Sequence, residues 1–294
     1  MDELEFYLED LKSKFLKINP SEYYLSYSGG KDSHFIFWFL REWLKGNDYE
    51  MYEKYSNIKI VGINTYMEHS DILKRINENC DIVLRPDLKP FEIKEKYGIP
   101  CFSKYQDEMI SRYNNGCRSV YLMEIVTRKT RNGEENTSRF VLNKQASRRL
   151  LEGDLHKVSN KCCEYLKKRP AKKYTKESKT KPILGVRGQE GILRKSQYKS
   201  CFKKDGTFTP LWDLSNELID KIYKKYNIEL PDVYDHIKRT GCMGCPYGNY
   251  KGNTEKELSL LNKNQTKFVC GYFKESYDVL GINYQKYLDD GKKG

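Results

Sequence analysis

Apolar residues are spaced in two different ways along this chain. Up to Asn19-Pro20, apolar side chains recur every three or four residues, which predicts an amphipathic helix over residues 3–17. Apolar runs of strand length follow at 23–27, 58–63, 80–85 and 182–184. Strands that alternate with helices predict a parallel sheet with right-handed crossovers. We therefore expect an α/β fold with a twisted parallel sheet flanked by helices and a helical extension at the C-terminus.

Three weaker patterns complete the expected organisation. The polar stretch 105–155 favours helices around a loop at 132–136, residues 210–223 predict a capped helix, and the tail from Thr254 favours helix. The domains that we expect are an N-terminal helix (1–19), a central domain that includes the cysteines (20–250) and a helical tail (251–294).

A glycine loop separates the first strand from a strongly apolar helix. The loop is Ser28-Gly29-Gly30-Lys31-Asp32-Ser33. Two glycines let several amide N–H groups converge at a helix N-terminus, which carries partial positive charge. A lysine and two serine hydroxyls add a cation and donors, so the loop predicts a phosphate or pyrophosphate site, with a spacing that differs from a Walker loop. The alternative is an ordinary polar turn.

A second polar motif follows the strand at 182–184. Gly185-Val186-Arg187 comes directly after it, and Arg194 follows Arg187 within the same stretch of the chain. Guanidinium groups bind phosphate and sulfate oxygens in bidentate fashion, so both arginines are candidates for the same anion. The alternative is a pair of surface charges.

The excess of positive charge adds anionic molecules to the candidate partners. Lysine and arginine exceed acidic residues by 53 − 41 = 12, and residues 167–181 carry eight basic side chains against one acidic. Such a run fits a nucleic-acid contact, a loop over an anionic substrate or a solvated linker. The N-terminus lacks the pattern of a signal peptide and no apolar run reaches about 20 residues, so we expect a cytoplasmic protein without a membrane segment.

Nine cysteines in such a chain favour metal or redox chemistry over disulfides. Cys242-x-x-Cys245 offers two thiolates to one centre, and Cys162-Cys163 or Cys201 are the distant residues that could complete the set. Spacing alone leaves an iron–sulfur cluster, zinc and metal-free packing open.

These motifs together resemble known families. Ser-Gly-Gly-Lys-Asp-Ser after a first strand resembles the pyrophosphatase (PP) loop of the adenine-nucleotide alpha-hydrolase superfamily, which has a Rossmann-type sheet. Gly185-x-Arg187 with Glu190 and Arg194 resembles the signature of the phosphoadenosine phosphosulfate (PAPS) reductase family, although Gly191 stands where serine is usual. Cys-Cys followed by Cys-x-x-Cys is similar to the 4Fe-4S pattern of assimilatory adenosine phosphosulfate (APS) reductases.

The resemblance implies roles for individual residues. It implies catalytic roles for Lys31, Asp32 and Arg187. It implies nucleotide contacts from Ser28, Gly29, Gly30, Lys31, Asp32, Ser33, Thr65, Gly185, Arg187 and Arg194. The implied cofactors are ATP or APS/PAPS, Mg²⁺ and a 4Fe-4S cluster on Cys162, Cys163, Cys242 and Cys245, with Cys201 as a substitute ligand and zinc as the alternative metal. Asn64 departs from the family's Asp-Thr strand end.

The tail decides between the activities that the resemblance implies. Sulfonucleotide reductases use a C-terminal Glu-Cys-Gly segment near a histidine, whereas this chain has Val269-Cys270-Gly271 and no histidine after His236. We therefore favour an ATP-using relative that cleaves at the alpha phosphate for sulfur transfer to a nucleic acid, with a sulfur-donor protein. APS or PAPS reduction and an inactive nucleotide- or nucleic-acid-binding protein are the alternatives, and a homo-oligomer stays open.

Overall fold

The protein is built on a four-stranded parallel sheet with helices on both faces. The computed structural model describes residues 2–190, 199–237 and 240–290. The strand order is β3-β2-β1-β4, with β1 Tyr23–Tyr27, β2 Lys59–Ile63, β3 Ile82–Leu84 and β4 Lys181–Leu184. In the register, Leu25 of β1 lies between Ile60 and Ile183. The predicted α/β class with a parallel sheet is confirmed.

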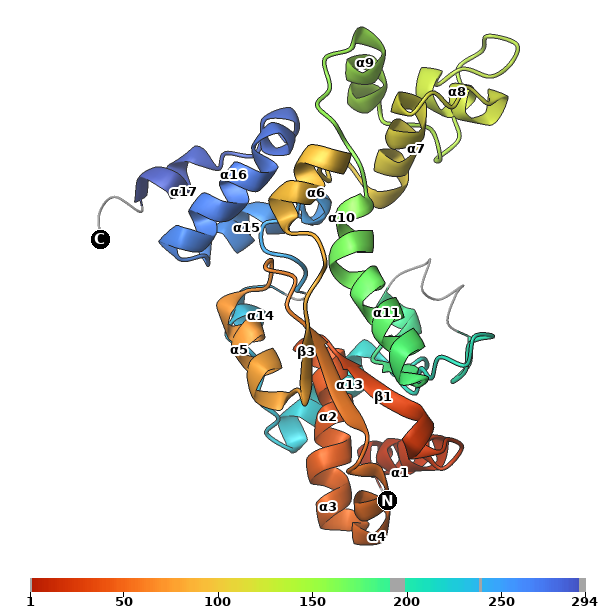
Figure 1. The fold of residues 1–294 in the computed structure, drawn as a ribbon, viewed down its shortest axis with the longest axis vertical. Coiled ribbons are helices and arrows are strands. Elements are labelled where there is room, and N and C mark those ends of the chain that lie inside the picture. Colours follow the sequence, from red (N-terminus) through yellow and green to blue (C-terminus); the bar gives the residue numbers. More distant parts are fainter. Residues whose placement is uncertain (1, 191–198, 238–239, 291–294) are drawn as a thin grey trace. The chain divides into compact units, whose positions relative to one another are not determined.

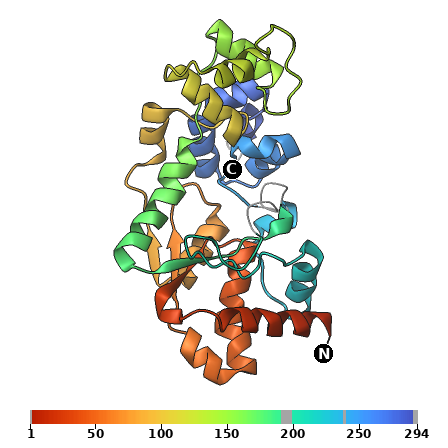
Figure 2. The same ribbon diagram turned by 90° about the vertical axis from the view of Figure 1, so that its right-hand side faces the viewer.

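Alternation along β1 explains why both faces are covered. Tyr24 and Tyr27 lie on opposite faces, since successive side chains of a strand point in opposite directions. The Tyr24 ring packs edge-on against Tyr174 at 5.0 Å between centroids, while Tyr27 hydrogen-bonds to His34 over 2.8 Å. The first contact holds α11 (Arg169–Ser178) and the second holds α2 (Lys31–Trp38), which Figures 1 and 2 show beside the strands.

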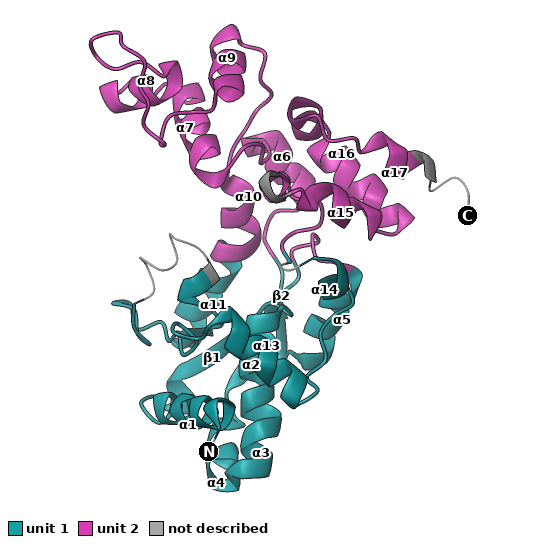
Figure 3. Cartoon of the chain, turned by 180° about the vertical axis from the view of Figure 1, so that it is seen from behind, with its two compact units in different colours: residues 1–64, 70–85, 169–240 teal, residues 65–69, 86–168, 241–294 magenta. Residues whose placement is uncertain are grey.

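The chain divides into two compact units, coloured in Figure 3. Unit 1 comprises residues 1–64, 70–85 and 169–240, and unit 2 comprises 65–69, 86–168 and 241–294. The two units therefore do not follow the expected domains 1–19, 20–250 and 251–294. The N-terminal helix belongs with the sheet in unit 1, and the tail belongs with Cys162, Cys163, Cys242 and Cys245 in unit 2.

Unit 1 contains the whole sheet. Its helical elements in the described residues, besides α2 and α11, are α1 Glu3–Phe15, η1 Pro20–Glu22, η2 Phe39–Trp43, α3 Leu44–Asn47, α4 Tyr49–Tyr55, α5 Ser70–Asn79, η4 Gly188–Glu190, α13 Asn216–Lys225 and α14 Val233–His236. The predicted N-terminal helix is confirmed, with Asp2 and Glu5 forming a capping box.

Two predicted segments of unit 1 need correction. The helix expected over 210–223 begins only at Asn216, because the Ser215 hydroxyl caps it by accepting the Leu218 N–H over 3.0 Å. Most of the basic run at 167–181 is helix α11 and the start of β4 rather than a loop or a linker. The reason is that Tyr174 and Thr175 anchor α11 on Tyr24.

Unit 2 is helical. Its elements are α6 Pro90–Tyr97, α7 Lys104–Asn114, α8 Val120–Thr127, α9 Lys144–Glu152, α10 Lys161–Cys163, η3 Glu164–Lys168, η5 Pro246–Lys251, α15 Asn253–Ser259, α16 Lys263–Leu280 and α17 Gln285–Asp290. The helices predicted within 105–155 and in the tail are confirmed. In neither unit does a described helix combine the length and the apolar character needed to cross a membrane.

Candidate functional site

The glycine loop is a closed turn between β1 and α2. Gly29 adopts φ +71°, a conformation that favours glycine, and Gly30 is the N-cap of α2. The Ser33 hydroxyl accepts the Ser28 N–H over 3.2 Å and donates to the Gly30 carbonyl over 3.0 Å. The Ser28 and Ser33 hydroxyls lie 3.0 Å apart. The two serines that the sequence singled out therefore fix the shape of the loop itself.

Gly185 brings the end of β4 against this loop. A Cβ atom at Gly185 would lie 2.7 Å from the Asp32 carbonyl carbon and from the Ser33 nitrogen, distances that real Cβ atoms do not reach. Only glycine lets the two backbones approach this closely. The close approach explains why a Gly-x-Arg motif follows the strand, since it delivers the next residues to the start of α2.

Arg187 and Asp32 form an ion pair at this junction. Arg187 Nε donates to Asp32 Oδ1 over 2.7 Å and its Nη1 donates to Asn216 Oδ1 over 2.6 Å. The arginine is only 7% exposed, so the interpretation of Arg187 as a surface charge is wrong. A carboxylate and an amide therefore fix the orientation of the guanidinium at the start of α2.

Lys31 lies in the first turn of α2, where an acidic side chain and an aromatic ring stabilise its positive charge. Its ammonium pairs with Asp220 and stands 5.2 Å from the centre of the Tyr223 ring, while the Tyr223 hydroxyl donates to the Lys31 carbonyl over 2.6 Å. The Asp220 side chain is 64% exposed, so solvent screens the ion pair and it is weakly held.

Two further predicted contacts are not among the described residues of unit 1. The Thr65 N–H and hydroxyl both donate to the Glu68 carboxylate, over 2.9 and 2.5 Å, and Thr65 belongs to unit 2. Arg194 lies outside the described residues. Sequence reasoning missed Asn216 and Asp220, because both are ordinary polar positions of an amphipathic helix that only the fold brings to the loop.

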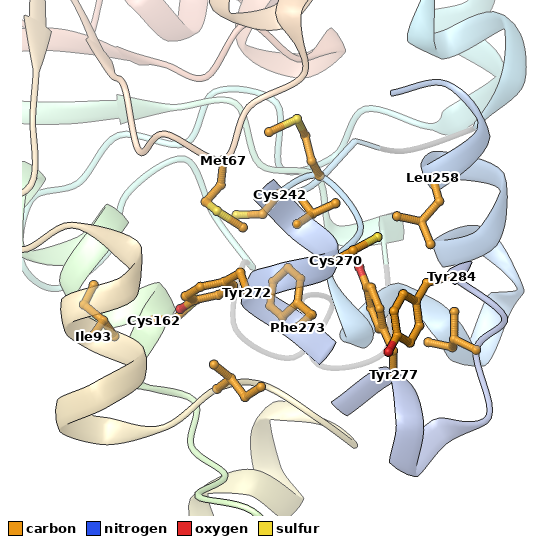
Figure 4. Close-up of a cluster of buried hydrophobic side chains, with 14 of the residues drawn as sticks. Met67, Ile93, Cys162, Cys242, Leu258, Cys270, Tyr272, Phe273, Tyr277 and Tyr284 are labelled. Atoms are coloured by element: carbon orange, nitrogen blue, oxygen red, sulfur yellow. The ribbon is translucent and has the colours of Figure 1, made fainter. Parts of the chain in front are cut away.

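The cysteines form a separate site within unit 2. Cys162 and Cys242 belong to one buried apolar cluster that also contains Met67 and Tyr272, and Cys163 and Cys245 pack against it (Figure 4). The Cys-x-x-Cys turn is fixed through its backbone. Met243 N–H donates to the Met67 carbonyl over 2.7 Å. Gly244 N–H donates to the Glu257 carboxylate over 3.0 Å and its carbonyl accepts the Tyr277 hydroxyl.

The thiols differ in how readily they ionise. A hydrogen bond from Cys162 and the charges of Lys104 and Lys167 lower the pKa of Cys163. Burial raises the pKa of Cys242 and of Cys245. When Cys242 is ionised, its negative charge raises the pKa of Lys167. The Cys163 thiol therefore lies near two cations that favour its ionised form, the form that can bind a metal ion.

Four sulfur donors in one buried region fit an iron–sulfur cluster or zinc in kind and number. As they stand, no three His, Cys, Asp or Glu side chains of the described residues form a group that could hold a single metal ion. Cys201, the predicted substitute, belongs to unit 1, where its carbonyl accepts the Thr209 N–H over 2.7 Å.

Comparisons with known proteins add little to this picture. No family model matches the chain, and no curated protein matches it. Among solved structures the chain is similar to a phosphoadenylyl-sulfate (PAPS) reductase from Candida auris, in a phosphate complex. The identity is 11% and the TM-score 0.40, over 80% of this chain and 92% of that chain. The α/β class rests on the chain's own sheet.

Proposed function

We propose that the chain is a PP-loop enzyme of the PAPS reductase type that binds an adenine nucleotide at residues 28–33. The observation that carries the proposal is the approach of Gly185 to Asp32 and Ser33, since it joins the loop to Arg187 at the carboxyl ends of parallel strands. Ligands of open parallel sheets bind at this edge. ATP, entering with Mg²⁺ on its phosphates, is the substrate that we favour.

The proposed reaction cleaves ATP between the alpha and beta phosphates, with an acceptor oxygen attacking the alpha phosphorus and pyrophosphate leaving. Lys31, Arg187 and the loop amides would neutralise the charge that builds up on the phosphate oxygens. Asp32 pairs with Arg187 over 2.7 Å, so its role is to orient the guanidinium rather than to hold the metal ion.

The acceptor that we favour is a nucleic acid, and the purpose is sulfur transfer. The charge of +12 and the eight basic residues at 167–181 suit a polyanion. Cys162, Cys163, Cys242 and Cys245 would hold a 4Fe-4S cluster, or zinc as the alternative. An iron–sulfur cluster would supply sulfur or electrons, and a donor protein would supply new sulfur.

Sulfonucleotide reduction is the second candidate, and one observation disfavours it. Cys270, the position nearest to a reductase nucleophile, is 2% exposed, and burial raises its pKa to about 11. A nucleophilic cysteine needs an exposed thiolate. An inactive nucleotide- or nucleic-acid-binding protein is the third candidate.

Pyrophosphate release from ATP tests the proposal. Purified protein is assayed with ATP, Mg²⁺ and a mixed tRNA or DNA acceptor, and Arg187→Ala is expected to lower the rate about 10²–10³-fold, as loss of one transition-state donor does. Lys45→Ala, an exposed lysine on α3, is the matched control. ATP binding without pyrophosphate release would favour the inactive binding protein. Reduction of APS that Cys270→Ser abolishes would favour the reductase.

A further inference from the structure

A tyrosine hydroxyl accepts a hydrogen bond from one of the backbone N–H groups of the loop. The Lys31 N–H, one of the amides at the start of α2 that helix geometry leaves without an intrahelical partner, donates to Tyr234 Oη over 2.9 Å. In the proposed function this amide is among those that a phosphate oxygen would use. A phosphate oxygen that accepts the Lys31 N–H has to replace Tyr234 Oη.

The contact is built by two elements rather than by a stray side chain. Tyr234 lies on α14, and the N–H of its neighbour Val233 donates to the Asp71 carboxylate over 3.0 Å. Asp71 also accepts the Ile72 N–H over 2.9 Å, and Ile72 lies 3.0 Å from the Cβ position of Gly29 through its carbonyl oxygen. The same helix, α5, thus touches the loop and holds the tyrosine.

Hydroxyls crowd the loop where Tyr234 meets it. The nearest atom to a Cβ position at Gly30 is Tyr234 Oη at 3.0 Å, followed by Ser28 Oγ and Thr240 Oγ1 at 3.5 Å. Tyr234 Oη and Thr240 Oγ1 lie 3.1 Å apart. Burial raises the pKa of Tyr234, so the phenol keeps its hydrogen at neutral pH and can donate it to Thr240.

We infer that Tyr234 is a built-in competitor for the phosphate site, a residue whose hydroxyl must leave the Lys31 amide before a phosphate oxygen takes its place. The inference rests on the proposed function, because it concerns the regulation of that same loop. It makes nucleotide affinity depend on α14 as well as on the loop. A ligand with several phosphate oxygens displaces the hydroxyl at the expense of one neutral hydrogen bond.

Calorimetric titration with inorganic pyrophosphate and with ATP tests the inference on the full chain. Tyr234→Phe removes the competing oxygen and keeps the ring, so its Kd is expected to fall about 3- to 10-fold, the worth of one net hydrogen bond. Tyr55→Phe is the matched control, because its hydroxyl donates to the carbonyls of Phe15 and Ile18, which are not residues of the loop. The Kd of this control is expected to stay unchanged.

A second readout separates competition from simple loosening of the fold. The exchange rate of the Lys31 amide hydrogen is expected to rise in Tyr234→Phe and to fall again when pyrophosphate is added, while the thermal midpoint falls by only the few degrees that one lost hydrogen bond costs. Equal Kd values for the wild type and Tyr234→Phe would overturn the inference and leave the proposed function standing. Weaker binding by Tyr234→Phe would also overturn it, since the hydroxyl would then be a ligand contact. No binding by any variant would overturn both.

Discussion

His34 behind the loop is a buried histidine held neutral. The Tyr27 hydroxyl lies 2.8 Å from its Nδ1 and accepts the Asn79 side-chain N–H over 3.0 Å, so the phenol hydrogen is directed to the ring. Burial lowers the pKa of His34 to about 3. The unfolded chain, with a pKa near 6.5, therefore takes up a proton that the folded chain refuses.

Because the unfolded state binds more protons below pH 6.5, this residue makes stability fall as pH falls through 6.5 toward 3. Urea unfolding of the wild type and of His34→Gln is expected to show the wild type losing up to about 2 kcal/mol more between pH 7 and pH 5. Burial also raises the pKa values of Asp107 and Glu257. Both proteins contain these carboxyl groups, so their effects on stability cancel when the wild type is compared with His34→Gln. A pH-independent difference would contradict the prediction.

Gly185 is the residue on which the proposed site most depends. An alanine methyl group there would overlap the backbone of Asp32 and Ser33, so Gly185→Ala is expected to cost about 1–3 kcal/mol by overpacking and to weaken pyrophosphate binding. Gly46→Ala is the matched control, since nothing lies within 4 Å of its Cβ position and its helix gains from alanine. Urea unfolding and titration check both variants, and equal behaviour would show that the backbone can yield.

At the scale of elements, α10 and the 242–245 turn each supply two cysteines to the same apolar cluster. Anaerobic reconstitution with iron and sulfide is expected to give a brown protein with about four irons per chain, as a cubane cluster requires. Cys242→Ser is expected to lose the colour and Cys201→Ser to keep it, because the apolar cluster already gathers the four cysteines that a cubane needs. A colourless wild type that contains one zinc would contradict the iron–sulfur expectation.

Elements were predictable where a local pattern fixes them. The apolar runs at 23–27 and 58–63 became β1 and β2, because alternating and buried side chains specify a strand within its own few residues. The start of α13 was predicted too early, since the decision lies in one capping hydroxyl, Ser215. The Lys31 to Tyr234 contact spans 203 residues, so no local pattern could indicate it.

At the scale of the whole molecule, the two units interleave along the chain. The backbone passes between them after residues 64, 69, 85, 168 and 240. Such crossings depend on contacts between distant segments, which is why the sequence suggested three consecutive domains. The loop belongs to unit 1, whereas Cys162, Cys163, Cys242 and Cys245, which we expected in the same domain, belong to unit 2.

The net charge of +12 is also a property of the whole chain. Affinity for a nucleic acid is expected to fall linearly on a log scale with salt, and Lys176→Glu on α11 is expected to reduce the slope by about 0.9 if it neutralises one phosphate of a duplex. Lys45→Glu on α3 is the charge-matched control. Filter binding at 50–200 mM salt measures both slopes, and equal slopes would remove α11 from the interface.

The strand order also sets the timing of assembly. β4 pairs with β1 although Tyr23 and its partner Lys181 are 181 − 23 = 158 residues apart. At a synthesis rate of about 5–20 residues per second, roughly 8–30 seconds pass between the synthesis of β1 and the synthesis of β4. The glycine loop is thus made early, and its arginine arrives only after most of the chain has been translated.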